Sequence, residues 1–274
     1  MDSMLVKGQR VKLFALFECA RFFNSRRGIT ALITYSIVWA FFSYKFVANA
    51  IEVLSNEQLK EFVEIAFGFV GMQKVLTLSV AEFSIFWPIT IVTMPVLAIF
   101  VSSDQLCSDI ARGTIRFLTL RASRNEIMLG RFVGQLCVLS VFIGVTLITV
   151  IAITLLRDIS LWFEALKLAG YLFLQLMIFL LPFVAIMTLF NSYLKSSKQA
   201  TIHFFLFYIL VSVASGVLVY YFGQPFAYIE YLLPDVNIKS AAALEVRWMI
   251  YAVPVVQSLF YLTVASFIFN RKEV

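Results

Sequence analysis

The chain has 274 residues, of which 61% are hydrophobic and 14% are charged, and it carries a formal net charge of +6. Soluble domains carry about 25% charged residues, so this composition excludes an ordinary soluble domain and predicts a membrane protein. The positive charge does not require a nucleic-acid partner, and we expect none, because the distribution of basic residues relative to the membrane accounts for it.

The N-terminal segment predicts a helix that lies along the membrane surface. In residues 9–25, apolar side chains such as Val11 and Ala15 recur at helical spacing on one face, and charged side chains occupy the opposite face. Phe14 breaks this pattern because it falls in the polar sector. Its ring is expected either to face lipid or to contact a partner protein. We assign residues 1–28 to this amphipathic interfacial helix.

Six stretches are apolar and long enough to cross a bilayer, because a spanning helix needs roughly 20 consecutive apolar residues. They cover residues 29–48, 83–103, 132–156, 168–194, 200–222 and 249–269. None of them requires a charged residue at its centre, where such residues usually mark ion pathways. The sequence therefore predicts an all-α membrane protein, whose transmembrane domain of six helices covers residues 29–274 and offers no obvious route for coupling ions.

The basic residues indicate how the chain is oriented. The N-terminal segment, the loops after the second and fourth spans and the C-terminal tail together hold 15 of the 22 Lys and Arg residues. By the positive-inside rule these segments lie in the cytoplasm. Both termini are then cytoplasmic, which agrees with an even number of spans. We expect a multi-pass protein of a cell membrane, the inner or plasma membrane of a bacterium.

Two segments on the other side of the membrane are expected to have structure of their own. Residues 52–82 contain an amphipathic pattern that predicts a helix on the outer surface. Residues 223–248 contain two prolines, Pro225 and Pro234, among many aromatic and aliphatic residues. This second segment is too apolar for a free loop and too interrupted for a span, so we expect a re-entrant or interfacial element.

The second span contains two prolines in its interior, Pro88 and Pro95. A proline inside a helix removes a backbone hydrogen bond and favours a kink. The span is therefore a candidate for a moving helix or for one that lines a transport pathway. A static kink is the alternative interpretation.

The loop between the second and third spans, residues 105–131, has an unusual composition. Five of its residues are arginines, and Ile115, Phe117, Leu118 and Leu120 lie between them. A loop that serves only solubility would not carry such an apolar patch. A loop that binds another protein would, because apolar and arginine side chains dominate the binding energy of protein interfaces.

The end of this loop predicts the start of a long helix. Ser123-x-x-Glu126 is a capping box, in which a serine hydroxyl and a glutamate carboxylate satisfy the first backbone amides of a helix. The helix is expected to begin near Arg124, to project about two turns from the membrane and to continue into the third span. Gly130 and Gly134 lie on it at a spacing that permits close packing against a second helix.

No constellation of residues in the sequence points to catalysis. The chain lacks a Gly-rich P-loop, and its one histidine, His203, does not make a zinc site with three scattered cysteines. Asp104 and Asp109 are expected to pair with nearby arginines. We therefore expect free thiols, no metal or cofactor in this chain and no enzymatic activity of its own. A transport reaction would need energy from another subunit.

The same loop matches a longer pattern, Asp109-x-x-x-Gly113-Thr114-x-x-x-Leu118-x-x-x-x-Ser123-Arg124-x-x-x-x-x-Gly130-Arg131. This pattern resembles the cytoplasmic loop of ABC transporter permeases of the type-2 export family. The family usually has Glu where this chain has Asp109, Pro where it has Arg121 and Lys where it has Arg131. The six spans, the N-terminal interfacial helix and the element before the last span also resemble that family.

The resemblance implies how this loop works. In the family, the loop forms a coupling helix that inserts into a cleft of a separate ATPase subunit, which holds the ATP and magnesium. The residues assigned to this contact are Asp109, Arg112, Gly113, Thr114, Ile115, Arg116, Phe117, Leu118 and Arg124, with Phe14 on the N-terminal helix. Apolar side chains can fill a pocket of the partner, and arginines can pair with its acidic rim.

The resemblance also implies two permease chains, identical or different, in one assembly with two ATPase chains. The substrate path is expected between the permeases, lined by the second and fifth spans. On the second span the candidates are Phe86, Thr90, Thr93 and Met94, for which ordinary helix packing is the alternative. The function expected is the membrane subunit of an ATP-driven exporter. The alternative is a membrane-anchored assembly or maturation factor that holds a cytoplasmic partner without moving cargo.

Overall fold

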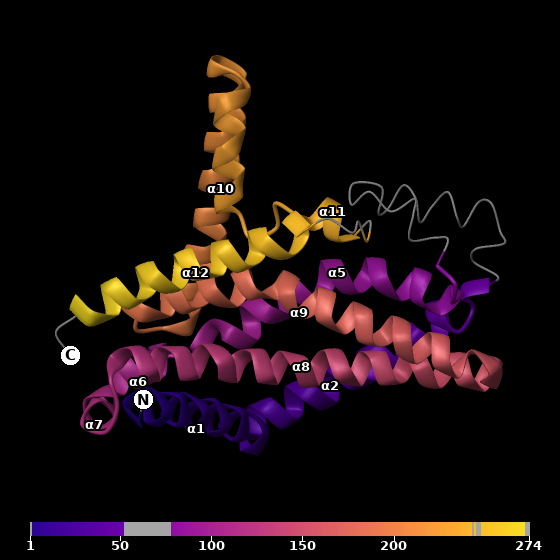
Figure 1. The fold of residues 1–274 in the computed structure, drawn as a ribbon, viewed down its shortest axis with the longest axis horizontal. Coiled ribbons are helices and arrows are strands. Elements are labelled where there is room, and N and C mark those ends of the chain that lie inside the picture. The colour runs from indigo at the N-terminus through magenta and orange to yellow at the C-terminus, as the bar shows by residue number, and fades with distance from the viewer. Residues whose placement is uncertain (1, 52–77, 243, 245–247, 272–274) are drawn as a thin grey trace.

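The computed structural model describes residues 2–51, 78–242, 244 and 248–271, and its regular elements are helices (Figure 1). The first are α1 (Asp2–Asn24), α2 (Arg26–Phe42), η1 (Ser43–Val47), α5 (Ala81–Val101) and η4 (Ser102–Asp104). Next come α6 (Cys107–Arg112), α7 (Ile115–Thr119), α8 (Arg124–Arg157), η5 (Ile159–Leu161) and α9 (Trp162–Tyr193). The last are α10 (Ser197–Phe222), η6 (Gln224–Leu232), α11 (Ile238–Ala242) and α12 (Trp248–Arg271). The outer helix predicted within 52–82 falls mostly outside the described residues.

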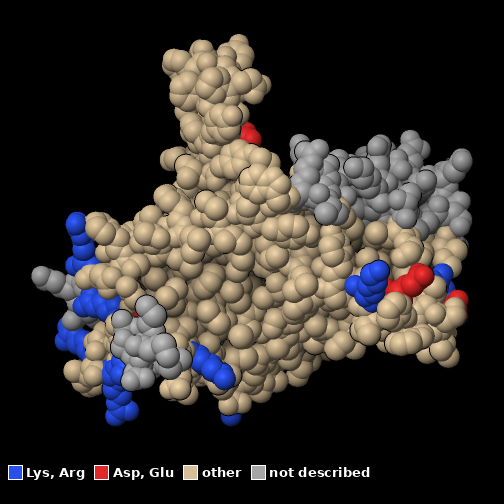
Figure 2. All heavy atoms as spheres, in the orientation of Figure 1, with Lys and Arg blue, Asp and Glu red and all other residues tan. Residues whose placement is uncertain are grey.

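Six helical stretches of the described chain are long and apolar enough to cross a membrane. They are Gly28–Val47, Ala81–Ala111, Arg124–Arg157, Ile159–Tyr193, Ser197–Phe222 and Trp248–Arg271. The prediction of an all-helical protein with six spanning helices is therefore confirmed. On the face that Figure 2 displays, charged side chains gather at the two ends of the bundle, and the wide region between them is almost uncharged. An uncharged belt of this kind suits the hydrocarbon core of a bilayer.

The helix α10 is arranged differently from the other spans. Figure 1 shows α5, α8, α9 and α12 running along the bundle, whereas α10 stands away from it. The segment η6 folds back along α10, so that the two form a projecting arm. Only Ala200, Phe204, Val211 and Ser215 of α10 are buried. The remaining apolar side chains of α10 need a cover of lipid or of a second protein chain.

The start of α1 and the end of α12 lie at the same end of the bundle as α6 and α7 (Figure 1). Arg10 of α1 forms an ion pair with Glu126 of α8 at 3.7 Å. Arg124 of α8 donates a hydrogen bond to the carbonyl of Phe269 in α12 at 2.8 Å. A common end agrees with six crossings of the membrane, and the assignment of that end to the cytoplasm stays a prediction.

The helix α8 begins where the capping box predicts. The Ser123 hydroxyl accepts a hydrogen bond from the Glu126 amide at 3.3 Å, and the Glu126 carboxylate accepts one from the Ser123 amide at 2.8 Å. The helix then continues for 34 residues to Arg157. At about 1.5 Å per residue it is longer than the roughly 30 Å hydrocarbon core. The end of the loop and the third span are therefore one continuous helix.

The helix α5 stays continuous through Pro88 and Pro95, both of which are buried. Its side chains form much of the main core, together with those of α2, α8 and α9. Trp87 also donates a hydrogen bond from its indole nitrogen to the Ala242 carbonyl at 2.8 Å, which joins α5 to α11. The chain's own helices therefore hold α5 along most of its length.

A second, smaller apolar cluster holds the loop against the bundle. It consists of the buried side chains of Leu106, Ile110, Ile115, Ala122, Ile127, Met128, Ala265 and Phe269. These residues come from the loop, from the first turns of α8 and from the last turns of α12. The smaller cluster is the core on which the candidate site is built.

Candidate functional site

The helices α6 and α7 are joined by a turn that requires glycine. Gly113 has a φ of +69°, in the left-handed region, and its amide closes α6 by donating to the Ile110 carbonyl at 3.2 Å. The hydroxyl of Thr114 lies 3.2 Å from the backbone carbonyl oxygen of Asp109 and 3.1 Å from its carboxylate. The Gly-Thr pair of the sequence motif is thus a helix-ending turn that Asp109 fixes in place.

Behind this turn lies an ion cluster formed by Glu18, Arg21, Asp109 and Arg131. Arg131 of α8 donates hydrogen bonds to the carboxylates of Glu18 in α1 and Asp109 in α6. Arg21 lies 2.9 Å from the Glu18 carboxylate and 3.6 Å from that of Asp109. The Gln135 amide adds a hydrogen bond to Glu18 at 2.9 Å. Because Glu18 and Arg131 are buried, each charge needs its partners, and the cluster holds α1, α6 and α8 in register.

Two glycines allow α1 to approach α8 closely. A Cβ atom at Gly130 would collide with the Cβ of Phe14, and one at Gly134 would collide with the Cβ of Glu18. The close helix packing predicted at this glycine pair is confirmed, and the packing partner is α1. Phe14 is accordingly partly buried against α8 rather than fully turned to lipid. Its contact with an ATPase subunit stays a prediction.

Arg124 and its neighbour Asn125 hold the end of α12. Arg124 donates hydrogen bonds to the carbonyls of Phe269 and Asn270, at 2.8 and 3.3 Å. The Asn125 side-chain oxygen accepts one from the Ser266 hydroxyl at 2.9 Å. A cation at the C-terminal carbonyls of a helix is favourable because those carbonyls lack partners within the helix. Arg124, predicted as a contact of the ATPase, therefore has a structural role within this chain.

The outward side of the loop combines apolar and basic side chains. Phe117 is 73% exposed and Leu120 is 82% exposed. Arg112, Arg116 and Arg121 are exposed as well, and within the described ranges none of the three forms an ion pair. We call these five residues the docking surface. Figure 2 shows basic side chains gathered at this end of the molecule.

The structure changes the set of residues predicted for this surface. Ile115 is fully buried in the smaller cluster, so it is wrong as an exposed contact. Leu118 is only partly exposed. Asp109 is held by arginines of its own chain, which agrees with the expected pairing of this carboxylate with nearby arginines. Leu120, which the predicted set omits, is prominently exposed, and its spacing of three residues from Phe117 is the signal in the sequence that points to it.

The candidates for a substrate path lie mostly inside the chain. Phe86, Thr90 and Met94 are buried in the main core, where the alternative of ordinary helix packing places them. Thr93 is exposed, and its hydroxyl bonds to a carbonyl of its own helix. Phe100, which the prediction did not include, is exposed farther along α5. Only Thr93 of the four candidates therefore lies on a surface that this chain leaves uncovered.

The three cysteines, Cys19, Cys107 and Cys137, are free thiols, as predicted. Burial, and to a smaller extent the neighbouring Cys137, raises the pKa of the Cys19 thiol above its ordinary value. Across the part of the chain that the structure describes, no group of three or more His, Cys, Asp or Glu side chains could hold a metal ion.

A comparison with known families identifies the chain. Residues 18–271 match the sequence profile of the family described as ABC-2 family transporter protein. No curated protein matches the chain. Permeases of this family generally pair with ATPase subunits and have no catalytic domain of their own. The chain therefore belongs to the ABC-2 family of transporter proteins and is a multi-pass membrane component of a transporter.

Proposed function

We propose that this chain is the permease subunit of an ATP-driven exporter and that a separate ATPase subunit binds at the docking surface. The observation that carries the proposal is the pair of exposed apolar side chains, Phe117 and Leu120, flanked by three exposed arginines. Large apolar side chains that fill a partner's pocket contribute most of the energy of an interface. Arginines around them speed association with an acidic partner surface and fix its orientation.

The inner side of the loop supports a role in transmitting movement. Ile115 joins α7 to the smaller cluster, which contains the first turns of α8 and the last turns of α12. Arg131 and Asp109 join α6 to α8 and α1 through the ion cluster. A force applied to α7 by the ATPase would thus reach three helices at once. Since α8 is continuous with the third span, its displacement enters the membrane without an intervening hinge.

We propose further that a second permease chain covers the exposed apolar faces of α5 and α10. On α5 the exposed apolar residues include Val96 and Phe100, which lie beside the exposed Thr93, and on α10 most of the helix is uncovered. Two permease chains that meet at these faces would enclose a path between them. The ATPase would then lie on the cytoplasmic side of a bacterial inner or plasma membrane, where ATP is available.

The proposal is tested by changing the docking surface and measuring what the tagged chain retains. Phe117→Asp and Leu120→Asp are each expected to reduce recovery of a co-purifying P-loop ATPase by at least about tenfold. Ile159→Asp is the matched control, because Ile159 is 76% exposed and lies between α8 and α9, far from α7 along the bundle. Undiminished recovery with both variants, at equal amounts of inserted protein, would rule out docking at α7.

A second measurement separates an exporter from a membrane-anchored assembly factor. Inverted membrane vesicles that contain the permease and its ATPase are supplied with a cell extract, with and without ATP. Mass spectrometry should find a compound that accumulates inside only with ATP and only with intact Phe117 and Leu120. An ATPase that binds the docking surface while no compound accumulates would favour the assembly factor.

A further inference from the structure

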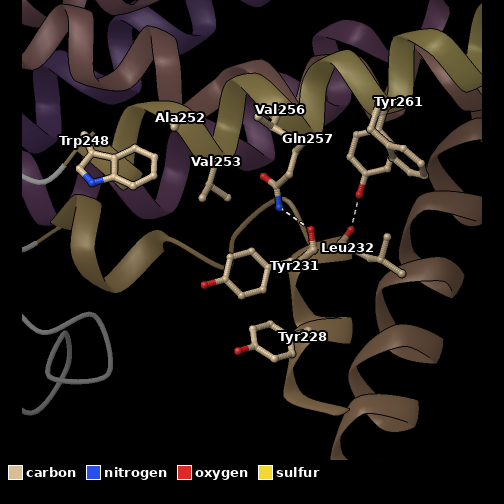
Figure 3. Close-up of a pocket in the computed structure, with 10 residues that line it drawn as sticks. Tyr228, Tyr231, Leu232, Trp248, Ala252, Val253, Val256, Gln257 and Tyr261 are labelled. Atoms are coloured by element: carbon tan, nitrogen blue, oxygen red, sulfur yellow. Dashed lines mark hydrogen bonds between the residues drawn. The ribbon is translucent and has the colours of Figure 1, made fainter. Parts of the chain in front are cut away.

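A pocket lies where η6 meets the first half of α12 (Figure 3), and none of its described lining residues belongs to the docking surface. Its volume of about 400 Å³ falls within the range of about 300–1,000 Å³ that is typical of small-molecule sites. Five rings line it, those of Tyr228, Tyr231, Trp248, Phe260 and Tyr261. The other residues that line it are aliphatic, apart from Gln257, and none of the described lining residues is charged.

Gln257 lines this pocket and carries an unsatisfied acceptor. Its amide nitrogen donates to the backbone carbonyls of Tyr231 at 2.7 Å and Leu233 at 2.9 Å. Two carbonyl acceptors on that side fix the orientation of the amide, because only the nitrogen can donate to them. The amide oxygen must therefore face the other way. It is buried, with only 7% of the residue exposed, and it has no donor among the described residues.

The aromatic side chains around the pocket do not supply the missing donor. The Tyr261 hydroxyl donates to the Leu232 carbonyl. In Figure 3 the hydroxyls of Tyr228 and Tyr231 and the indole nitrogen of Trp248 point away from the Gln257 amide oxygen. A buried acceptor without a donor is costly, and native proteins rarely leave one without a role. The missing donor is therefore expected from a ligand.

We propose that this pocket binds an amphipathic molecule with an alkyl or aromatic body and one N–H or O–H donor, which bonds to the Gln257 amide oxygen. The aromatic walls would cover the apolar body, and their negative faces also favour an ammonium group. Carboxylates are disfavoured, because none of the described residues that line the pocket is a cation and a carboxylate offers no donor to Gln257. Such a molecule is either neutral or cationic.

The position of the pocket links it to the rest of the molecule through α12. The pocket is built on the first half of α12, and Arg124 and Asn125 hold the last turns of the same helix. A ligand that moves η6 relative to α12 would act on a helix whose far end belongs to the loop region. Binding itself does not depend on whether an ATPase docks at α7.

The test uses the full chain in lipid nanodiscs without an ATPase and four probes that differ only in their head group. Decylamine and decanol carry a donor, whereas decyl methyl ether and, at neutral pH, decanoate do not. Trp248 fluorescence reports binding, and Trp248→Phe gives the background from the other three tryptophans of the chain. We expect saturable changes with the amine and the alcohol, and at least about tenfold weaker binding of the ether and of decanoate.

Substitutions then distinguish binding of a probe in the pocket from its partitioning into the surrounding bilayer. Val253→Phe fills the pocket while Gln257 itself stays unchanged, and it should abolish the saturable response. Leu259→Phe adds a ring on an exposed part of α12 outside the pocket and should leave the response unchanged. The proposal is overturned if the ether binds as tightly as decanol, or if a well-folded Val253→Phe responds as the wild type does. If Val253→Phe does not fold, the comparison of head groups in the wild type decides alone.

Discussion

Arg131 is a buried charged side chain that depends on partners from two other helices. Its guanidinium lies between two carboxylates, and a different nitrogen of the group donates to each of them. An ammonium group is a point charge, whereas a guanidinium presents several donors in a fixed plane. The chain has Arg at the position where the resembling permeases usually have Lys, and the two-sided pairing with Glu18 and Asp109 accounts for this difference.

Replacing Arg131 tests the ion cluster at the scale of one residue. Arg131→Met should lower the free energy of unfolding by about 3–5 kcal/mol, because it leaves the carboxylates of Glu18 and Asp109 with one partner fewer in a buried site. Arg131→Lys keeps the positive charge and should lower the free energy of unfolding by clearly less than Arg131→Met does. Thermal unfolding of the purified protein in one detergent measures both changes. Equal stability of Arg131→Met and the wild type would show that the cluster does not hold α1 in place.

The sequence predicted an arginine partner for Asp109, but it could not predict that Glu18 pairs with Arg131. Glu18 and Arg131 are 113 positions apart, and a charge on an amphipathic helix is ordinarily exposed to solvent. Ile115 is a second example, because α7 has only five residues and a helix that short does not define one face by its periodicity. Its inward orientation follows from packing against α8 and α12, which are distant in the chain.

At the scale of elements, the contact between α1 and α8 depends on backbone proximity at two glycines. Gly134→Val places atoms where Glu18 now lies, so it should push α1 away from α8. Cys19 of α1 reports this movement, because burial slows the reaction of its thiol with a maleimide in two ways. Burial shields the thiol from the reagent, and it raises the thiol pKa, so that less of the reactive thiolate is present. In a chain that lacks the other two cysteines, Gly134→Val should make Cys19 react several-fold faster. Gly144→Val, which meets no atom within 4 Å, should leave the rate unchanged.

A different result would change the description of this contact. If Cys19 reacts at the same rate in Gly134→Val and Gly144→Val, then α1 is held by the ion cluster alone. The spacing of Gly130 and Gly134 predicted close packing but not the identity of the packing helix, because a local sequence pattern contains no information about which distant helix packs against it. The start of α8 at Arg124 was predictable for the opposite reason, since a capping box involves only neighbouring residues.

At the scale of the whole molecule, the number and approximate positions of the six spans follow from hydrophobicity alone. The direction of α10 does not follow from hydrophobicity, because an apolar helix makes the same backbone hydrogen bonds whether it packs in the bundle or stands away from it. Its exposed apolar length makes α10 the element that most needs lipid or a second chain.

The orientation of the molecule is testable with a maleimide that does not cross membranes. In a chain without its native cysteines, Ile159→Cys should be labelled on intact cells, whereas Arg121→Cys should be labelled only after the membrane is opened. The reason is the concentration of exposed arginines at the α7 end, which the positive-inside rule assigns to the cytoplasm. Labelling of Arg121→Cys on intact cells would reverse the orientation and remove the docking surface from the reach of a cytoplasmic ATPase.

The central claim, that α7 presents the docking surface for an ATPase subunit, is tested most directly by photo-crosslinking in living cells. A photoreactive amino acid is placed at Leu120 and, as the matched position at the other end of the bundle, at Ile159. We predict a crosslinked product between position 120 and a P-loop ATPase, identified by mass spectrometry, and no such product from position 159. A stable, inserted protein that gives no ATPase adduct from position 120 would contradict the account.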